Sequence, residues 1–164
     1  MARMQAQTTL PSTIIHDHFL ADHQRLDELF ARLLGAFEAD DRELVASSWT
    51  ELEAGLLAHL EAEEKFLVPA LARTSERDAR AILHEHRHIR GRLADLGAGV
   101  DLHIVRLDAA RAFIDELRAH AAHEEALMYR WGDQYLVASE RQSLFSALVE
   151  GVRARLERVR ARTA

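Results

Sequence analysis

The chain has 164 residues, with 27 acidic side chains, 21 basic side chains, a net charge of −6 and no cysteine. A negative chain does not favour nucleic-acid binding, and the lack of thiols excludes disulfides and sulfur-ligated metals. Residues 1–12 read as an extension without a signal-peptide core, and no apolar run approaches the ~18 residues that cross a bilayer. We therefore expect a cytoplasmic protein that binds neither nucleic acid nor membranes.

Apolar side chains at helical spacing predict four long helices and a fifth, C-terminal one. These segments span about 13–37, 40–69, 74–96, 101–137 and 138–164. Asp40 begins a capping box at the start of the second helix, the sequence GAGVD breaks the third, and Asp101 caps the fourth.

Short connections make neighbouring helices antiparallel, so the predicted fold is all-α, an up-down-up-down four-helix bundle over residues 13–137. The additional segment, 138–164, is an amphipathic helix. We expect it to pack on the bundle or on a partner subunit, in which case the protein forms a homo-oligomer through this helix.

Two His-x-x-x-Glu pairs lie on the apolar faces of the predicted helices. His59 comes seven residues after Leu52, and Glu63 follows one turn later, so both point inward with the core side chains. In the fourth helix, the sequence HAAHEEALMY places His120 and Glu124 in the same relation. The inward pair therefore occurs twice.

The first and third helices each add one inward histidine. His23 lies four residues after Phe19 on the core stripe of the first helix. In the third helix, HEHRHIR contains a His-x-x-x-His pair, His84 and His88, but these share the arginine-rich face. His86 lies between them on the apolar face, so we predict that His86 is the inward residue.

Six polar groups are thus expected in one core. They could be unrelated residues joined by ordinary hydrogen bonds. However, a buried unpaired charge costs several kcal/mol, and a domain has only about 5–15 kcal/mol of net stability. A shared metal cation resolves the conflict, and imidazole with carboxylate suits iron, manganese or zinc. The expected ligands are His23, His59, Glu63, His86, His120 and Glu124.

The four segments that carry these residues are DHQRL, HLEAEEKFLVP, EHRHIR and HAAHEEALMY. In order and spacing they resemble the hemerythrin-like (HHE cation-binding) domains, over about residues 13–130. The resemblance implies a non-haem di-iron centre, two irons joined by two carboxylates and an oxo or hydroxo group, with manganese or zinc as alternatives. By this likeness, His23 and His59 would bind one iron, His86 and His120 the other, and Glu63 and Glu124 would bridge.

The sequence departs from the family's oxygen carriers at one position. Carriers have a second histidine four residues before the one that matches His86, and Ile82 stands there. Two open irons favour processing of dioxygen, hydrogen peroxide or other small oxidants, whether by catalase-like turnover, iron oxidation or sensing. The alternatives are reversible binding or storage of oxygen or iron, and a metal-free structural bundle. His16, His123 or Glu125 could complete the coordination.

Overall fold

The structure is a computed structural model that describes residues 14–163. The predicted extension at 1–12 and residues 13 and 164 lie outside the described part. Its helices are α1 (Ile14–Glu38), α2 (Arg42–Ala62), the π-helical turn η1 (Glu63–Leu67), α3 (Val68–Ala72), α4 (Glu76–Asp101), α5 (Leu107–Leu127), α6 (Tyr129–Tyr135) and α7 (Ala138–Thr163). No strand occurs in the described range, and the predicted all-helical class is confirmed.

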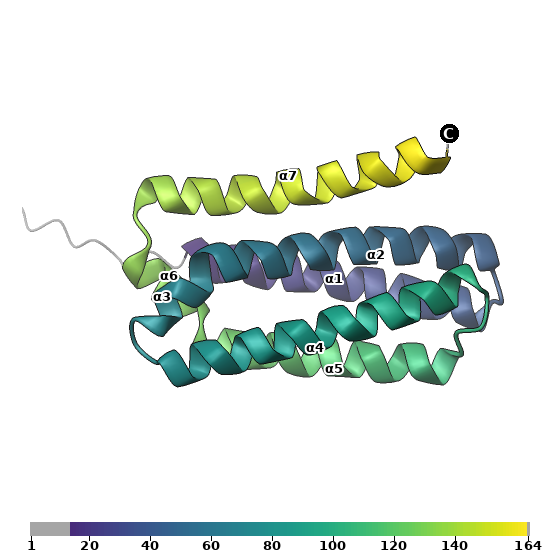
Figure 1. Cartoon of the computed structure of the whole chain (residues 1–164), viewed down its shortest axis with the longest axis horizontal. Coiled ribbons are helices and arrows are strands. Elements are labelled where there is room, and N and C mark those ends of the chain that lie inside the picture. The colour runs from purple at the N-terminus through teal and green to yellow at the C-terminus, as the bar shows by residue number, and fades with distance from the viewer. Residues whose placement is uncertain (1–13, 164) are drawn as a thin grey trace, which may run out of the picture.

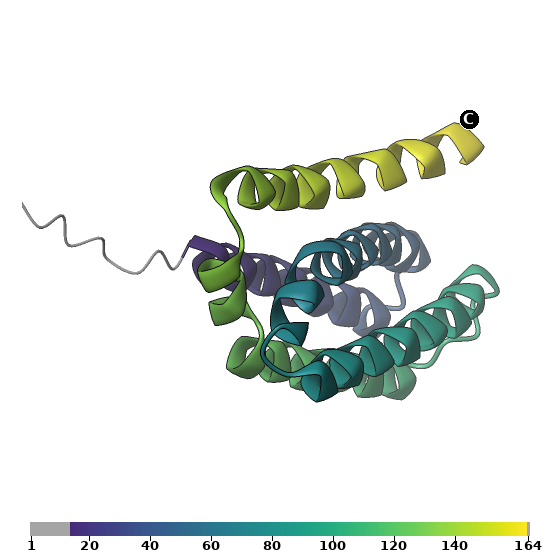
Figure 2. The ribbon, with the colours of Figure 1, turned by 60° about the vertical axis from the view of Figure 1, so that its left-hand side comes forward.

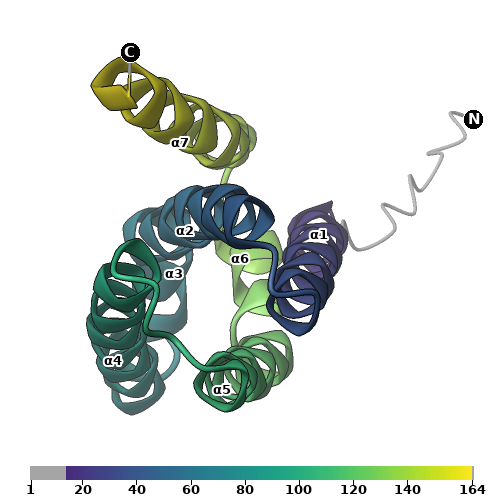
Figure 3. The ribbon, with the colours of Figure 1, turned by 90° about the vertical axis from the view of Figure 1, so that its right-hand side faces the viewer.

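Four long helices surround a common interior. Figure 3 views them end on, with α1, α2, α4 and α5 following one another around the ring. The short helices α3 and α6 contact each other at one end (Figure 1). Helix α7 lies outside the ring, and its main contact is with α2 (Figures 1 and 2).

The core has two apolar clusters. The first includes Leu26, Phe30, Leu33, Trp49, Leu52, Leu56, Ile89, Leu93, Phe113 and Leu117. The second includes Ile15, Phe19, Leu67, Leu71, Ile82, Met128, Tyr129 and Leu144. His23 lies between Phe19 of the second cluster and Leu26 of the first, and His86 lies likewise between Ile82 and Ile89. The inward histidines of α1 and α4 therefore mark the level at which one cluster gives way to the other.

Three predicted helix ends are wrong. Asp41, not Asp40, caps α2, because its carboxylate accepts a hydrogen bond from the Leu44 N–H at 3.0 Å. The GAGVD sequence does not break the third helix, since α4 runs through it to Asp101. The predicted cap at Asp101 is wrong for the same reason, because α5 begins only at Leu107 and its N-cap residue is Arg106.

The glycines of α4 permit close packing instead of ending the helix. A Cβ at Gly97 would lie 3.1 Å from Trp49 Nε1, and one at Gly99 would lie 2.7 Å from Val105 Cγ2. These two positions of the helix take glycine because neighbouring side chains occupy the space where a Cβ would lie.

Two irregular points occur in the chain next to the predicted glutamates. Pro69 has no N–H to donate, and the preceding turn is π-helical, with the Val68 N–H bonded to the carbonyl of Glu63. Helix α5 ends at Leu127, and the Met128 N–H bonds back to the Glu124 carbonyl at 2.7 Å before α6 begins. π-Helical turns such as η1 are frequent at functional sites.

Helix α7 packs along α2 through small and apolar residues. Leu144 and Leu148 are buried, and a Cβ at Gly151 would lie 3.0 Å from Ala58 Cβ. Arg155 also forms an ion pair with Glu61 of α2. None of the helices within 14–163 is long and apolar enough to span a membrane.

Candidate metal centre

The six side chains selected from the sequence meet at the level between the two clusters. Five of them are at most 8% exposed, and the His23 side chain is 10% exposed. Nε2 atoms of His23 and His59 lie 3.2 Å apart. Nε2 of His86 and of His120 lie 2.9 Å and 2.8 Å from Glu124 Oε1. All four imidazoles thus turn the same nitrogen toward the centre.

The donor atoms form two groups with one member in common. The first group contains His23, His59, Glu63 and Glu124; the second contains His86, His120 and Glu124. Within each group, one atom per residue lies within 4.8 Å of the others. Glu63 also approaches the second group, because its Oε2 is 3.6 Å from His86 Nε2. The histidine pairs are those that the resemblance implies, and their role as ligands stays a prediction.

In each of the four histidines, the other ring nitrogen, Nδ1, donates a hydrogen bond through its N–H to a carboxylate. The Nδ1 pairs are His23 with Glu125 at 2.9 Å, His59 with Asp22 at 2.8 Å, His86 with Glu64 at 3.0 Å and His120 with Glu85 at 2.7 Å. We call these four residues the outer carboxylates. Such a bond fixes the ring orientation and directs Nε2 inward, so that Nε2 can bind a metal once its proton is lost, as at many metal sites.

Arginines hold two of the outer carboxylates. Arg25 pairs with Asp22 at 2.8 Å, and Arg90 pairs with Glu64 at 3.0 Å. Burial opposes the charged form of Asp22, but the hydrogen bond and charge of His59, together with Arg25, lower its pKa to about 2. Asp22 therefore stays ionised and orients His59.

Tyr129 is a member of the site that the helical pattern did not indicate. Its buried hydroxyl donates to Glu63 Oε1 at 2.9 Å and also lies 2.9 Å from His23 Nε2. Burial, followed by the charges of Glu63 and Glu124, raises the pKa of Tyr129 well above its usual value. The break at Met128 turns this side chain inward, and regular helical counting across residues 127–129 does not reveal that.

The electrostatics of the centre favour positive charge on the imidazoles. Burial opposes protonation of His59 and His120, yet the facing carboxylates raise the pKa of His59 well above its usual value and that of His120 to about 9. Burial raises the pKa of Glu63, and the Glu124 charge adds to this effect. The hydrogen bonds of Glu124 to the histidines outweigh its burial and lower its pKa. Two adjacent carboxylates thus draw protons, or another cation, into the core.

Two buried atoms of the proposed ligands lack a hydrogen bond. Glu63 Oε2 accepts none and lies 3.6 Å from His86 Nε2, and His120 Nε2 is 2.8 Å from Glu124 Oε1 without hydrogen-bond geometry. A cation between these donors would satisfy both atoms, because an imidazole lone pair and a carboxylate oxygen each bind a metal. The set of nitrogen and carboxylate donors without sulfur fits iron, manganese or zinc.

The remaining histidines named from the sequence lie outside both groups. His84 and His88 are exposed, as the apolar pattern predicted, and His88 faces Glu116 at 3.5 Å. His16 is 41% exposed beside Asp17. His123 donates to Glu85, an outer carboxylate, and Glu125 holds His23. Neither His16, His123 nor Glu125 contributes to the two donor groups of the described residues.

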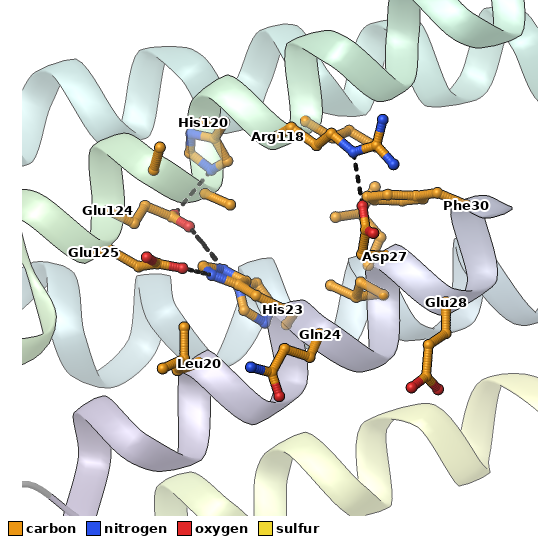
Figure 4. A pocket seen from close by; sticks show the side chains of 16 residues that line it. Leu20, His23, Gln24, Asp27, Glu28, Phe30, Arg118, His120, Glu124 and Glu125 are labelled. Atoms are coloured by element: carbon orange, nitrogen blue, oxygen red, sulfur yellow. Dashed lines mark hydrogen bonds and ion pairs between the residues drawn. The ribbon is translucent and has the colours of Figure 1, made fainter.

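A cavity of about 510 Å³ opens onto the centre between α1 and α5. In Figure 4, His120 and Glu124 reach toward it from one wall and His23 from the other. His59 also lines it, so members of both donor groups line the cavity. Small molecules therefore have a route from solvent to the buried residues.

The fold and the site define a helical bundle with a cluster of buried His and Glu side chains that could hold a metal ion. The family model of the hemerythrin HHE cation-binding domain matches residues 14–131, and the chain belongs to this family. This membership implies that the domain binds a metal cation. Comparison with curated proteins and with solved structures gave no match.

Proposed function

We propose that this chain is a non-haem di-iron protein that processes oxygen species at the buried centre. The proposed ligands are His23, His59, Glu63, His86, His120 and Glu124. The observation that carries the proposal is the pair of donor groups that share Glu124, because a shared carboxylate is what joins two adjacent ions. Manganese and zinc fit the same donors, and iron is proposed on the strength of the family.

The charge balance supports two ions. The carboxylates in and around the centre are Glu63, Glu124, Asp22, Glu64, Glu85 and Glu125, and the arginines that pair with them are Arg25 and Arg90. With the histidines neutral, six negative and two positive groups leave a net charge of −4. Two divalent cations would balance this charge. The cost of leaving it unbalanced is greatest at Glu63 and Glu124, which are fully buried, and smaller at Glu64, Glu85 and Glu125, which are about a third exposed.

The chain's own residues have separate tasks in this proposal. A bound pair of iron ions would supply Lewis acidity and exchangeable electrons. The outer carboxylates hold the imidazoles in one tautomer and orientation. The two apolar clusters exclude bulk water on both sides of the centre. Tyr129 donates to Glu63 and fixes the carboxylate orientation.

The small number of ligands for each ion favours reaction with oxidants over reversible oxygen binding. Ile82, at the position where oxygen carriers have a further histidine, is fully buried in the second apolar cluster. Each ion would have two imidazoles and a share of two carboxylates, which leaves both ions accessible to a small oxidant. Peroxide disproportionation, which converts two hydrogen peroxide molecules to two waters and one dioxygen, needs no outside reductant. Reversible binding or storage of oxygen or iron is the second candidate.

We also propose that residues 13–137 form the metal-binding bundle and that 138–164 form an appended helix. The packing of Leu144 and Leu148 against the second apolar cluster supports attachment of α7 to its own bundle. Hydrogen peroxide and dioxygen are the proposed small-molecule partners.

The test uses iron-loaded protein. Peroxide consumption is measured against the same concentration of free iron, and the ferrous protein is exposed to oxygen and then to vacuum. The proposal predicts peroxide consumption above the free-iron level and no reversible oxygenated spectrum. A stable spectrum that reverses on oxygen removal, without peroxide consumption, would place the protein with the carriers.

A further inference from the structure

The cavity between α1 and α5 is much larger than the oxidants considered so far. Its volume is about 510 Å³, whereas one water molecule occupies ~30 Å³ in the liquid. Pockets of ~300–1,000 Å³ are typical of sites for organic molecules. Hydrogen peroxide or dioxygen alone would leave most of this volume to water.

Small side chains on α5 create the space. Ala121 and Ala122 line the cavity where larger residues would close the gap to α1. Apolar side chains that line the cavity include Phe30 on α1 and Leu117 on α5, and the polar side chains Gln24, Asp27, Glu28 and Arg118 line it as well. The donors His23, His120 and Glu124 lie at one end of the cavity, and Phe30 lies at the other (Figure 4). A ligand with a hydrocarbon body and an oxygen-rich end matches this division.

The charges around the cavity select against anions. Arg118 is the one Lys or Arg side chain among the lining residues, and Asp27 already pairs with it at 2.7 Å. Glu28 and Glu125 add negative charge to the rim and wall. A negative charge on the part of the ligand that lies away from the centre would meet these carboxylates, so the hydrocarbon body of the ligand should carry no negative charge.

We propose that this cavity binds a neutral organic hydroperoxide, with its hydrocarbon part against the apolar residues Phe30 and Leu117 and its oxygen end toward the donors of the centre. The assignment deepens the proposed function and rests on it for the chemistry. In one stoichiometric reaction of the reduced protein, the O–O bond of the hydroperoxide would break and two protons would be taken up, with the two electrons supplied by a bound pair of ferrous ions. The products are one alcohol, one water and two ferric ions.

Binding can be tested without any turnover. The full chain is loaded with zinc, which is redox-inactive, and titrated with cumyl alcohol, the stable alcohol that cumene hydroperoxide would leave. Binding is followed by calorimetry and by methyl NMR signals. Benzenesulfonate serves as the anionic probe, because it keeps the aromatic ring and replaces the neutral end by a charge that binds metals weakly.

Two matched variants locate the site. Ala121→Leu extends a side chain into the cavity, and Ala119→Leu makes the same change in the groove between α5 and α4. We expect one cumyl alcohol per chain, weakened about tenfold or more by Ala121→Leu and unchanged by Ala119→Leu. Benzenesulfonate should bind more weakly than cumyl alcohol. Metal content and circular dichroism establish that both variants fold.

The methyl signals give a readout that does not depend on a variant. Cumyl alcohol should shift the signals of Leu20, Leu26 and Leu117 and leave those of Leu144 and Leu148 on the α7 side unchanged. Absence of saturable binding, shifts confined to other regions, or equal effects of the two alanine variants would overturn the proposal. Because the zinc protein performs no redox chemistry, these results stand apart from a failure of peroxide consumption by the iron protein.

Discussion

The hydroxyl of Tyr129 donates a hydrogen bond to Glu63 Oε1 over 2.9 Å, and both side chains are fully buried. The two residues are 66 positions apart, and each lies at the first residue of a short helical segment, α6 and η1. The π-helical turn at Glu63 and the break between α5 and α6 therefore bring a phenol and a carboxylate together at the centre. This contact gives the first prediction.

Tyr129→Phe should destabilise the metal-free protein by about 1–3 kcal/mol, because it removes the donor from a buried carboxylate oxygen. Urea unfolding in the presence of a chelator measures the loss. Tyr135→Phe is the control, since this half-buried side chain stacks on Trp131 away from the centre. Equal stability of the two variants would show that the contact with Glu63 does not contribute.

The second prediction concerns the histidines of α4. His86→Ala should lower metal content, because it removes a buried imidazole from the second donor group. The double variant His84→Ala/His88→Ala should keep the metal content of the unmodified chain, since both side chains are exposed. Atomic absorption on the purified variants decides between them. The opposite pattern would mean that α4 is rotated relative to the described structure.

The third prediction tests the outer carboxylates. Asp22→Asn leaves the proposed ligands in place but weakens the charge that orients His59. Loss of such a partner typically costs ~10–100-fold in metal affinity, and we expect an effect of this size in competition with a chelator. Asp27→Asn on the same helix is the matched control, because Asp27 pairs with Arg118 on the surface. Equal affinities for the two variants would exclude an orienting role for Asp22.

The fourth prediction follows from the raised pKa values of His59 and His120 in the metal-free protein. At pH 7 both imidazoles are in the doubly protonated, positively charged form, because the pKa of His120 is about 9 and that of His59 is raised well above its usual value. Metal binding at Nε2 must displace these protons, so about two protons should be released per chain at pH 7. Calorimetry in buffers of different ionisation enthalpy counts them.

The same shift sets the pH dependence of stability without metal. A pKa raised in the folded state means that protonated His120 contributes stability fully below its ordinary pKa of 6.5, and that this contribution is lost as the pH rises through about 9. Metal affinity should change in the opposite direction and increase between pH 7 and 9. Proton release near zero, with affinity independent of pH, would contradict these assignments.

Periodicity was sufficient to identify the inward faces. The seven-residue relation of His59 to Leu52 and the position of His86 between Ile82 and Ile89 depend only on regular helices, and α2 and α4 are regular at these points. Burial of these two histidines agrees with the sequence prediction. Binding of metal by them stays a prediction.

The residues that sequence analysis missed have identifiable physical causes. Asp22 shares a helix face with His18 and Arg25, and polar residues of this kind indicate a solvated surface. In the structure, α7 faces these residues, and the two helices line a cavity there. The local sequence of α1 does not predict the position of α7. Glu64 reaches His86 from a π-helical turn, which regular 3.6-residue counting does not anticipate. The inward direction of the Tyr129 side chain depends on the break between α5 and α6, which regular helical counting does not predict.

Metal content per chain, measured for the unmodified protein and for Glu124→Ala, tests the central claim most directly, because Glu124 is the residue common to both donor groups. Glu116→Ala is the control, since Glu116 pairs with His88 and Arg92 on the outer face. The two-ion centre predicts two ions per chain for the unmodified protein and for Glu116→Ala, and one ion or none for Glu124→Ala. An unmodified protein that binds no metal, or a Glu124→Ala variant that keeps two ions with an unchanged spectrum, would contradict it.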